Sequence, residues 1–164
     1  MLFRSLENRL IERLTRHGSI EVAGVHALIP GLSTLPLSFY RTDSLVAWGQ
    51  AAGAEYVVLV HVGSARLERR KDIHVPLLFH RYATVGVIEG ELRVIEVSRG
   101  RLAMAEPFKI EEKGPRAFQA TMDDNIHDPD LHLTAPAKGR FFHELEEALA
   151  GMLVKRIGSV IRMR

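Results

Sequence analysis

Apolar residues recur at helical spacing at both ends of the chain. Near the start, leucines repeat every four positions from Leu2 to Leu14, and Gly18 follows as a residue suited to ending a helix. Near the end, the apolar stripe consists of Phe141, Leu145, Leu149, Met152, Leu153, Ile157, Val160 and Ile161. We therefore expect a helix at each end of the chain, each with one buried face.

The next segments predict a strand, a helix and a strand. Ile20–Val25 has the composition of a short strand, and Thr42 or Asp43 can cap a helix that Gly53 ends. Ala54–Val60 follows with an apolar run that does not alternate, which is typical of a central strand covered on both faces. Together these segments predict a βαβ unit with a right-handed crossover.

The inner face of the predicted middle helix carries little bulk. Its residues Leu45, Gly49 and Ala52 are spaced for one helix face. Small side chains allow close approach, so we expect this face to pack directly on a sheet.

A meander of extended segments follows. The pattern predicts strands at Ser64–Arg70, Phe79–Val97 and Arg101–Glu111, with turns at Lys71–Asp72 and Ser98–Gly100 and a polar connection over residues 112–139. In the middle strand the apolar positions change from odd to even numbers near Gly90, where we expect a bulge. The predicted fold is one α/β domain over residues 1–164, with a mixed sheet of four to five strands (the βαβ unit plus the antiparallel meander) and about three helices.

Composition narrows the class of protein. The chain has 164 residues, of which 46% are hydrophobic, no cysteine, and a formal net charge of +2. This excludes a disordered chain, a disulfide scaffold and a cysteine nucleophile. Basic residues are interleaved with acidic ones, and the densest basic run, Arg66–Lys71, contains a glutamate. We therefore expect no nucleic-acid partner, because such binders concentrate positive charge.

Three segments resemble one known family. Gly53–Val60 resembles its Gly-Ala-Asp/Glu-Tyr strand, Leu92–Leu102 its valine-rich hairpin, and Leu145–Ile161 its closing helix. The segments occur in the same order as in the CsgG, LpoB and TolB N-terminal-like family of bacterial envelope accessory proteins and lipoproteins. The family's first strand and lipid-attachment signal have no counterpart in this sequence.

The resemblance implies a binding role rather than a reaction. Members of this family activate cell-wall synthases or build secretion and export assemblies. The implied location is the periplasm or envelope, although the sequence also leaves the cytoplasm open. We expect a protein partner and self-association, and contact with a membrane only through an anchor that this chain lacks.

Two apolar segments are the predicted partner surfaces. One precedes the middle helix, and the other forms the tip of the first hairpin of the meander. Contiguous exposed apolar patches mark partner surfaces, although the hairpin tip could also fold back over the core. The predicted partner-binding residues are Leu35, Phe39, Tyr40, Val75, Leu77, Leu78 and Phe79.

An acidic segment is the alternative candidate for chemistry. Within Asp123–His132, the side chains suited to a divalent cation are those of His127, Asp128, Asp130 and His132. Their spacing matches neither an EF-hand loop nor a zinc-protease helix, and such segments are usually solvated turns. We therefore expect no bound metal or other cofactor.

No catalytic motif is apparent. The sequence has no G-x-S-x-G elbow and no glycine-rich phosphate loop. Glu89, Glu91 and Glu96 share one extended segment without the pocket that acid–base carboxylates need. The predicted function is therefore a non-enzymatic interaction or assembly module of the bacterial envelope. The alternatives are a metal-dependent enzyme using the Asp123–His132 segment and a weak nucleic-acid binder.

Overall fold

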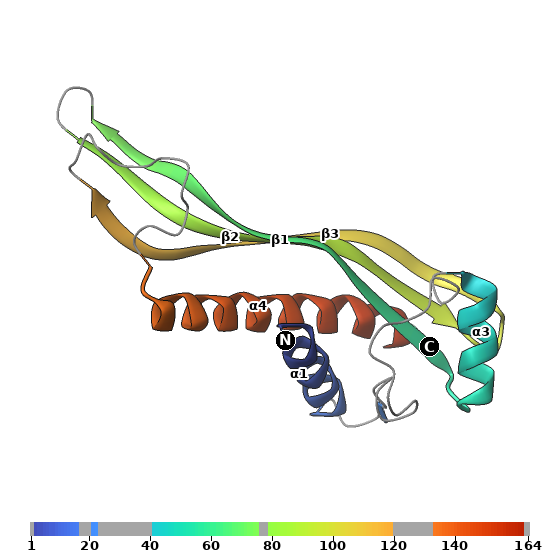
Figure 1. The fold of residues 1–164 in the computed structure, drawn as a ribbon. Coiled ribbons are helices and arrows are strands. Elements are labelled where there is room, and N and C mark those ends of the chain that lie inside the picture. Colours follow the sequence, from blue (N-terminus) through green and yellow to red (C-terminus); the bar gives the residue numbers. More distant parts are fainter. Residues whose placement is uncertain (1, 17–20, 23–40, 76–78, 120–132, 163–164) are drawn as a thin grey trace. The chain divides into compact units, whose positions relative to one another are not determined.

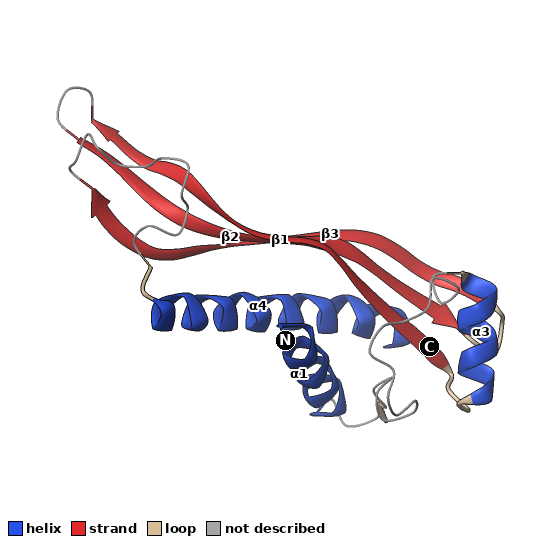
Figure 2. Cartoon of the chain, viewed as in Figure 1, coloured by secondary structure: helices blue, strands red, loops and turns tan. Residues whose placement is uncertain are grey.

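A computed structural model describes residues 2–16, 21–22, 41–75, 79–119 and 133–162 (Figures 1 and 2). The helices are α1 (Leu2–Arg16), α3 (Thr42–Ala51) and α4 (Ala135–Arg162). The strands are β1 (Tyr56–Val75), β2 (Phe79–Glu96) and β3 (Arg101–Gln119). The chain is thus an α/β protein, with the helices at both ends where the apolar stripes predict them.

The described strands form one antiparallel sheet in the order β1-β2-β3. The predicted mixed sheet of four to five strands and the βαβ unit are not found among these residues. Within the predicted first strand, Glu21 and Val22 are neither helical nor extended in a ladder, and its remaining residues lie outside the description. The meander is the part of the predicted sheet that is present.

The strands are longer than the sequence pattern predicts. β1 continues through Lys71 and Asp72, so the predicted turn there is wrong. β3 continues to Gln119 and α4 begins at Ala135, which shortens the predicted connection at both ends. Polar composition misled the prediction, because strands with exposed faces tolerate the same charged residues as loops.

The chain divides into two compact units, which are described separately. The first unit contains residues 1–61, 91–107 and 149–164, with α1, α3 and the second half of α4. The second unit contains residues 62–90 and 108–148, with the remaining parts of the strands and the first half of α4. The prediction of a single domain over residues 1–164 stays a prediction.

In the first unit, α3 packs on the sheet through its small face. Leu45 joins a buried cluster with strand residues that include Val57 and Val97. A Cβ atom added to Gly49 would lie 2.6 Å from a methyl group of Val97 and 2.8 Å from one of Val57. Only glycine permits this approach, which confirms the predicted packing face except at Ala52, which is exposed.

The ends of α3 were predicted only in part. Gly53 has a φ of +68° and follows the last turn, as expected of a residue that ends a helix. The predicted N-cap at Thr42 or Asp43 is wrong, because Arg41 occupies that position and makes no side-chain capping hydrogen bond.

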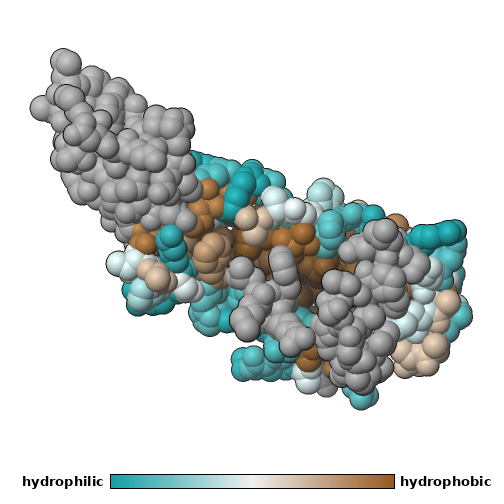
Figure 3. All heavy atoms as spheres, in the orientation of Figure 1, coloured by the Kyte–Doolittle hydropathy of each residue, from teal (hydrophilic) through white to brown (hydrophobic). Residues whose placement is uncertain are grey.

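In the second unit, α4 lies directly on the strands. Leu145 packs where Gly86 leaves room on β2, and the ring of Phe141 lies 3.2 Å from the position of a Cβ atom on Gly114 of β3. Both helix side chains are almost completely buried. In Figure 3, apolar side chains gather where α4 meets the strands, and the predicted apolar side of this helix is confirmed.

The turn between β2 and β3 has the predicted sequence and position. The Gly100 amide donates to the Val97 carbonyl at 3.1 Å, and Gly100 has a φ of +58°, which favours glycine. The buried carboxylate of Glu96 pairs with Arg101 at 3.2 Å and with Arg99 at 3.5 Å. These ion pairs tie the turn to the end of β2.

The pairing of β1 with β2 changes register along the strands. In the first unit, the odd-numbered Val57 shares a buried cluster with the odd-numbered Val97. In the second unit, the even-numbered Ser64 contacts the odd-numbered Glu89. In a regular antiparallel pair, neighbours on one side of the sheet either all share odd or even numbering or all differ in it. The two contacts differ in this respect, so one strand contains an extra residue between them. The interval includes Gly90, where the sequence predicts a bulge.

Candidate functional site

The predicted partner and metal residues fall outside what the structure describes. Leu35, Phe39, Tyr40, Leu77 and Leu78 belong to segments without a description, as do His127, Asp128, Asp130 and His132. Val75 and Phe79 end β1 and begin β2, and their side chains are likewise outside the description. The roles of these residues therefore stay predictions, and the candidate site lies on strands that the structure describes.

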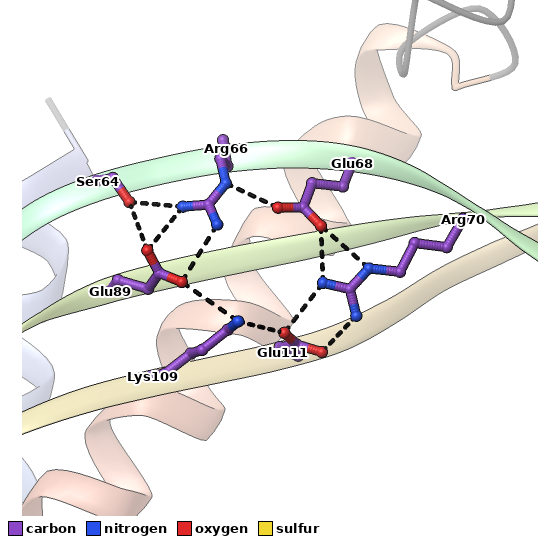
Figure 4. A network of polar contacts seen from close by, with 7 residues as sticks. All are labelled: Ser64, Arg66, Glu68, Arg70, Glu89, Lys109 and Glu111. Carbon is purple, nitrogen blue, oxygen red and sulfur yellow. Dashed lines mark hydrogen bonds and ion pairs between the residues drawn. The ribbon is translucent and has the colours of Figure 1, made fainter.

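A layer of ion pairs covers one side of the sheet in the second unit (Figure 4). We call it the ion-pair layer, and it consists of Ser64, Arg66, Glu68, Arg70, Glu89, Lys109 and Glu111. The members on each strand are spaced by two, so their side chains point to the same side. Three cations therefore alternate with three carboxylates on one surface.

The ion pairs cross from strand to strand. Arg66 of β1 lies 2.9 Å from Glu89 of β2, and Lys109 of β3 lies 3.3 Å from the same carboxylate. Arg70 of β1 reaches Glu111 of β3 at 2.6 Å. The second contact of Arg70, at 2.7 Å, is with Glu68 of its own strand. Because Arg70 and Glu111 belong to the two outer strands, their ion pair spans the central strand.

Buried apolar residues of that central strand lie on the same side of the sheet as the layer. Val85 and Val87 precede Glu89 by four and two positions, so they point to the same side as its carboxylate. Their exposed fractions are 3% and 0%. On the other side of β2, Gly86 faces Leu145 of α4. The ion-pair layer and α4 thus lie on opposite sides of β2.

The charges of the layer hold each other in their ionised forms. The hydrogen bond from Arg66 lowers the pKa of Glu89 to about 2, and that from Arg70 lowers the pKa of Glu111 to about 2. Arg70 also lowers the pKa of Glu68, and the pKa values of the arginines are raised in turn. Carboxylates held so far below neutral pH are poor proton donors or acceptors near pH 7. The arrangement suits structure rather than acid–base chemistry.

The layer predicts a loss of stability in acid. Glu89 and Glu111 titrate near 4.5 ordinarily and near 2 in the fold, so their stabilising effect is complete above about pH 4.5 and disappears as the pH falls toward 2. The variant Glu89→Gln/Glu111→Gln should be less stable than the wild type at pH 7, and its stability should fall less between pH 5 and about 2. Urea unfolding at a series of pH values measures both effects.

A matched control is Glu12→Gln, which removes an exposed carboxylate from α1, where it pairs with Arg16. This variant should keep the acid dependence of the wild type, because exposed i,i+4 pairs contribute little. Equal acid dependence in the double variant and the wild type would contradict a stabilising role for the layer.

The other glutamates of β2 are also paired. Glu91 accepts a hydrogen bond from Arg93, which lowers its pKa. Arg66 and Arg70, which belong to the basic run in the sequence, have their charge balanced by glutamates. Because this charge is balanced, a structural role for the two arginines is favoured rather than binding of nucleic acid.

The outer strands of the first unit carry exposed apolar side chains. Among the described residues, the large apolar side chains with high exposure are Val58 of β1, at 36%, and Leu102 of β3, at 44%. The sequence predicted both to be buried. Val57 and Leu59 are buried on either side of Val58, so β1 has one covered face and one open face here.

The two outer strands differ in how their edges are closed. Pro107 of β3 has no N–H group to donate, and its carbonyl accepts a hydrogen bond from Arg156 of α4 at 3.0 Å. Arg156 also pairs with Glu106 at 3.4 Å. Proline and charge are devices that keep an edge strand from pairing further. β1 has neither over Tyr56–Val60, which contains no proline and no charged residue.

Sequence reasoning missed both features. The ion-pair layer has a signal in the sequence, since Arg66, Glu68 and Arg70 alternate in sign at a spacing of two, as Lys109 and Glu111 do. The outer position of β1 in the described sheet has none, because a run of apolar residues does not show which strand lies beside it.

The described residues contain neither of two general kinds of feature, a metal-binding cluster and a membrane-spanning helix. They contain no group of three or more histidine, aspartate or glutamate side chains placed to hold a metal ion. In the part of the chain with a description, no helix combines the length and hydrophobicity needed to cross a bilayer.

Comparison with known proteins adds no relative. Neither a family model, nor a curated protein, nor a solved structure matches this chain.

Proposed function

We propose that the chain is a non-enzymatic interaction and assembly module that binds protein partners, a second copy included, through the outer strands of its sheet. The observation that carries this proposal is the position of Val58 and Leu102, which are exposed on the two outer strands of the first unit. An outer strand offers backbone N–H and C=O groups to a partner strand. Exposed apolar side chains beside those groups add favourable burial when the partner binds.

The proposed setting is the bacterial envelope, in the periplasm or bound to an envelope machinery for secretion, export or cell-wall synthesis. The resemblance to the CsgG, LpoB and TolB N-terminal-like family supports this setting. α3, β1, the β2–β3 hairpin and α4 occur in the order on which that resemblance rests. The apolar segments at Leu32–Phe39 and Val75–Phe79 are proposed as further contact surfaces.

The competing arrangement within one chain is a βαβ unit with a fourth strand at Ile20–Val25. Such a strand would run parallel to β1 and cover its outer edge. A partner strand would then have to use another edge of the sheet. The position at which partners contact the chain therefore distinguishes the two arrangements.

Site-specific photo-crosslinking in the cells that produce the protein tests the proposal. A benzophenone amino acid is placed at Val58, at Leu102, or at the exposed Gln50 of α3 as the control. We expect protein adducts at one or both strand positions and none above background at Gln50, with the adducts identified by mass spectrometry. Adducts that are absent from both strands, or equally abundant at Gln50, would contradict the proposed function.

A further inference from the structure

The hydrogen-bonding direction of β1 follows from one contact. The Val97 amide of the sheet donates to the Glu55 carbonyl at 2.9 Å. In an antiparallel ladder, successive residues turn their backbone groups alternately to one neighbour and to the other. Glu55 therefore turns toward β2, and regular alternation from it turns Val57 and Leu59 the same way. Tyr56, Val58 and Val60 turn their N–H and C=O groups to the outer edge.

We propose that this edge of β1 pairs with the same edge of a second copy, antiparallel, about a two-fold axis through Val58. The inference rests on the proposed function and specifies its partner. In this register Val58 faces Val58 of the second copy, and Tyr56 faces Val60. These are the residues whose backbone groups point outward, so each pair exchanges two hydrogen bonds, about six across the axis.

The side chains in this register are complementary. Tyr56 opposite Val60 is an aromatic residue facing a β-branched one, which stabilises paired strands, and the exposed Val58 becomes covered. Just beyond them, the exposed Glu55 and His61 face each other across the axis, a carboxylate opposite an imidazole. Because no charged residue lies between, no like charges meet.

A second copy fits β1 better than β3. The edge of β3 contains Pro107 and the Arg156 side chain bonded to its carbonyl, which block a continuous ladder. A two-fold contact is self-complementary, so one open edge per chain is sufficient for a closed dimer. Pairing over five residues buries a small area, and we therefore expect a weak, concentration-dependent dimer.

Cysteine substitution tests the register, because the chain has no cysteine of its own. In Val58→Cys the two thiols lie on the axis, with Cα atoms about 5.5 Å apart, which is within the disulfide range of about 4.4–6.8 Å. We expect rapid formation of a disulfide-linked dimer under mild oxidation. In Val60→Cys the two Cα atoms of the substituted residue are about 14 Å apart, since each lies two positions from the axis and the two strands are themselves about 5 Å apart, and the thiols should not link.

Two further measurements test the same register. A mixture of Tyr56→Cys and Val60→Cys chains should form the mixed disulfide dimer. Val58→Lys should weaken the dimer by about tenfold or more in sedimentation equilibrium, because two ammonium groups meet on the axis. Gln50→Lys, which adds the same charge away from the edge, should leave the dimer unchanged.

The outcomes separate this inference from the proposed function. Linking of Val60→Cys as fast as Val58→Cys, or a monomer at every concentration, would overturn the two-fold pairing. If Leu102→Cys links instead, or if the crosslinker at Val58 captures another protein, the pairing fails while the proposed function stands. If neither self-association nor strand-specific adducts are found, the two-fold pairing and the proposed function are both wrong.

Discussion

Replacing Leu145 by alanine is expected to destabilise the protein by about 2–5 kcal/mol. Its side chain is 0% exposed and lies between α4 and the strands of the second unit. There it occupies the space that Gly86 leaves open on β2. Truncation removes buried methyl groups and leaves a cavity, and both effects lower the free energy of unfolding. Urea unfolding at pH 7 measures the loss.

The same contact predicts a rescue. Gly86→Ala alone should cost about 1–3 kcal/mol, because the added Cβ atom would overlap the buried Leu145. In Gly86→Ala/Leu145→Ala the new methyl group enters space that Leu145 has left, so the double variant should be less destabilised than the sum of the single changes.

A suitable control is Gly158→Ala on the same helix, where an added Cβ atom meets nothing within 4 Å. It should stabilise α4 by roughly 0.5–1 kcal/mol through helix propensity alone. Strictly additive effects of Gly86→Ala and Leu145→Ala would mean that the two residues do not share one packed space.

The helices and one turn of the fold could be predicted, because the spacing of apolar residues and the positions of glycines determine them. The four-residue spacing from Leu2 to Leu14 and the stripe from Phe141 to Ile161 correspond to α1 and α4. Gly49 and Gly53 were correctly assigned to close packing and to a helix end. Each of these positions depends on its near neighbours in the chain, which the sequence shows directly.

The number of strands and their neighbours could not be predicted in the same way. Tyr56–Val60 is apolar throughout, which favoured a central strand covered on both faces. β1 is instead an outer strand of the described sheet, and Val58 is exposed because it lies on the open face of that strand. Leu102 occupies an apolar position in an alternating pattern that is typical of a half-buried strand, yet its side chain too is exposed. Burial of a strand face depends on which distant element covers it, and alternation carries no information on that point.

The candidate site shows the same limit. The alternating charges of Arg66, Glu68 and Arg70 could have indicated a charged face, but not that Arg70 would reach Glu111 across β2. That contact depends on strand register, which a bulge shifts by one residue and which no local pattern determines.

The proposed edge pairing makes a residue-specific prediction for amide hydrogen exchange. The amides of Val57 and Leu59 turn toward β2 and should exchange slowly at every protein concentration. Those of Tyr56, Val58 and Val60 turn outward and should be protected only in the dimer. At a total chain concentration about ten times the dissociation constant, about one fifth of the chains stay monomeric, so the exchange of these amides should slow by about fivefold relative to a dilute sample.

Exchange at the Val58 amide, followed by NMR from dilute to concentrated protein, is therefore the most direct measurement of whether β1 has an associating edge. The account predicts fast exchange in the dilute sample and slow exchange in the concentrated one, in step with dimer formation. Slow exchange at every concentration would show that another segment of the same chain covers the edge. Fast exchange at every concentration would show that no strand pairs with this edge of β1.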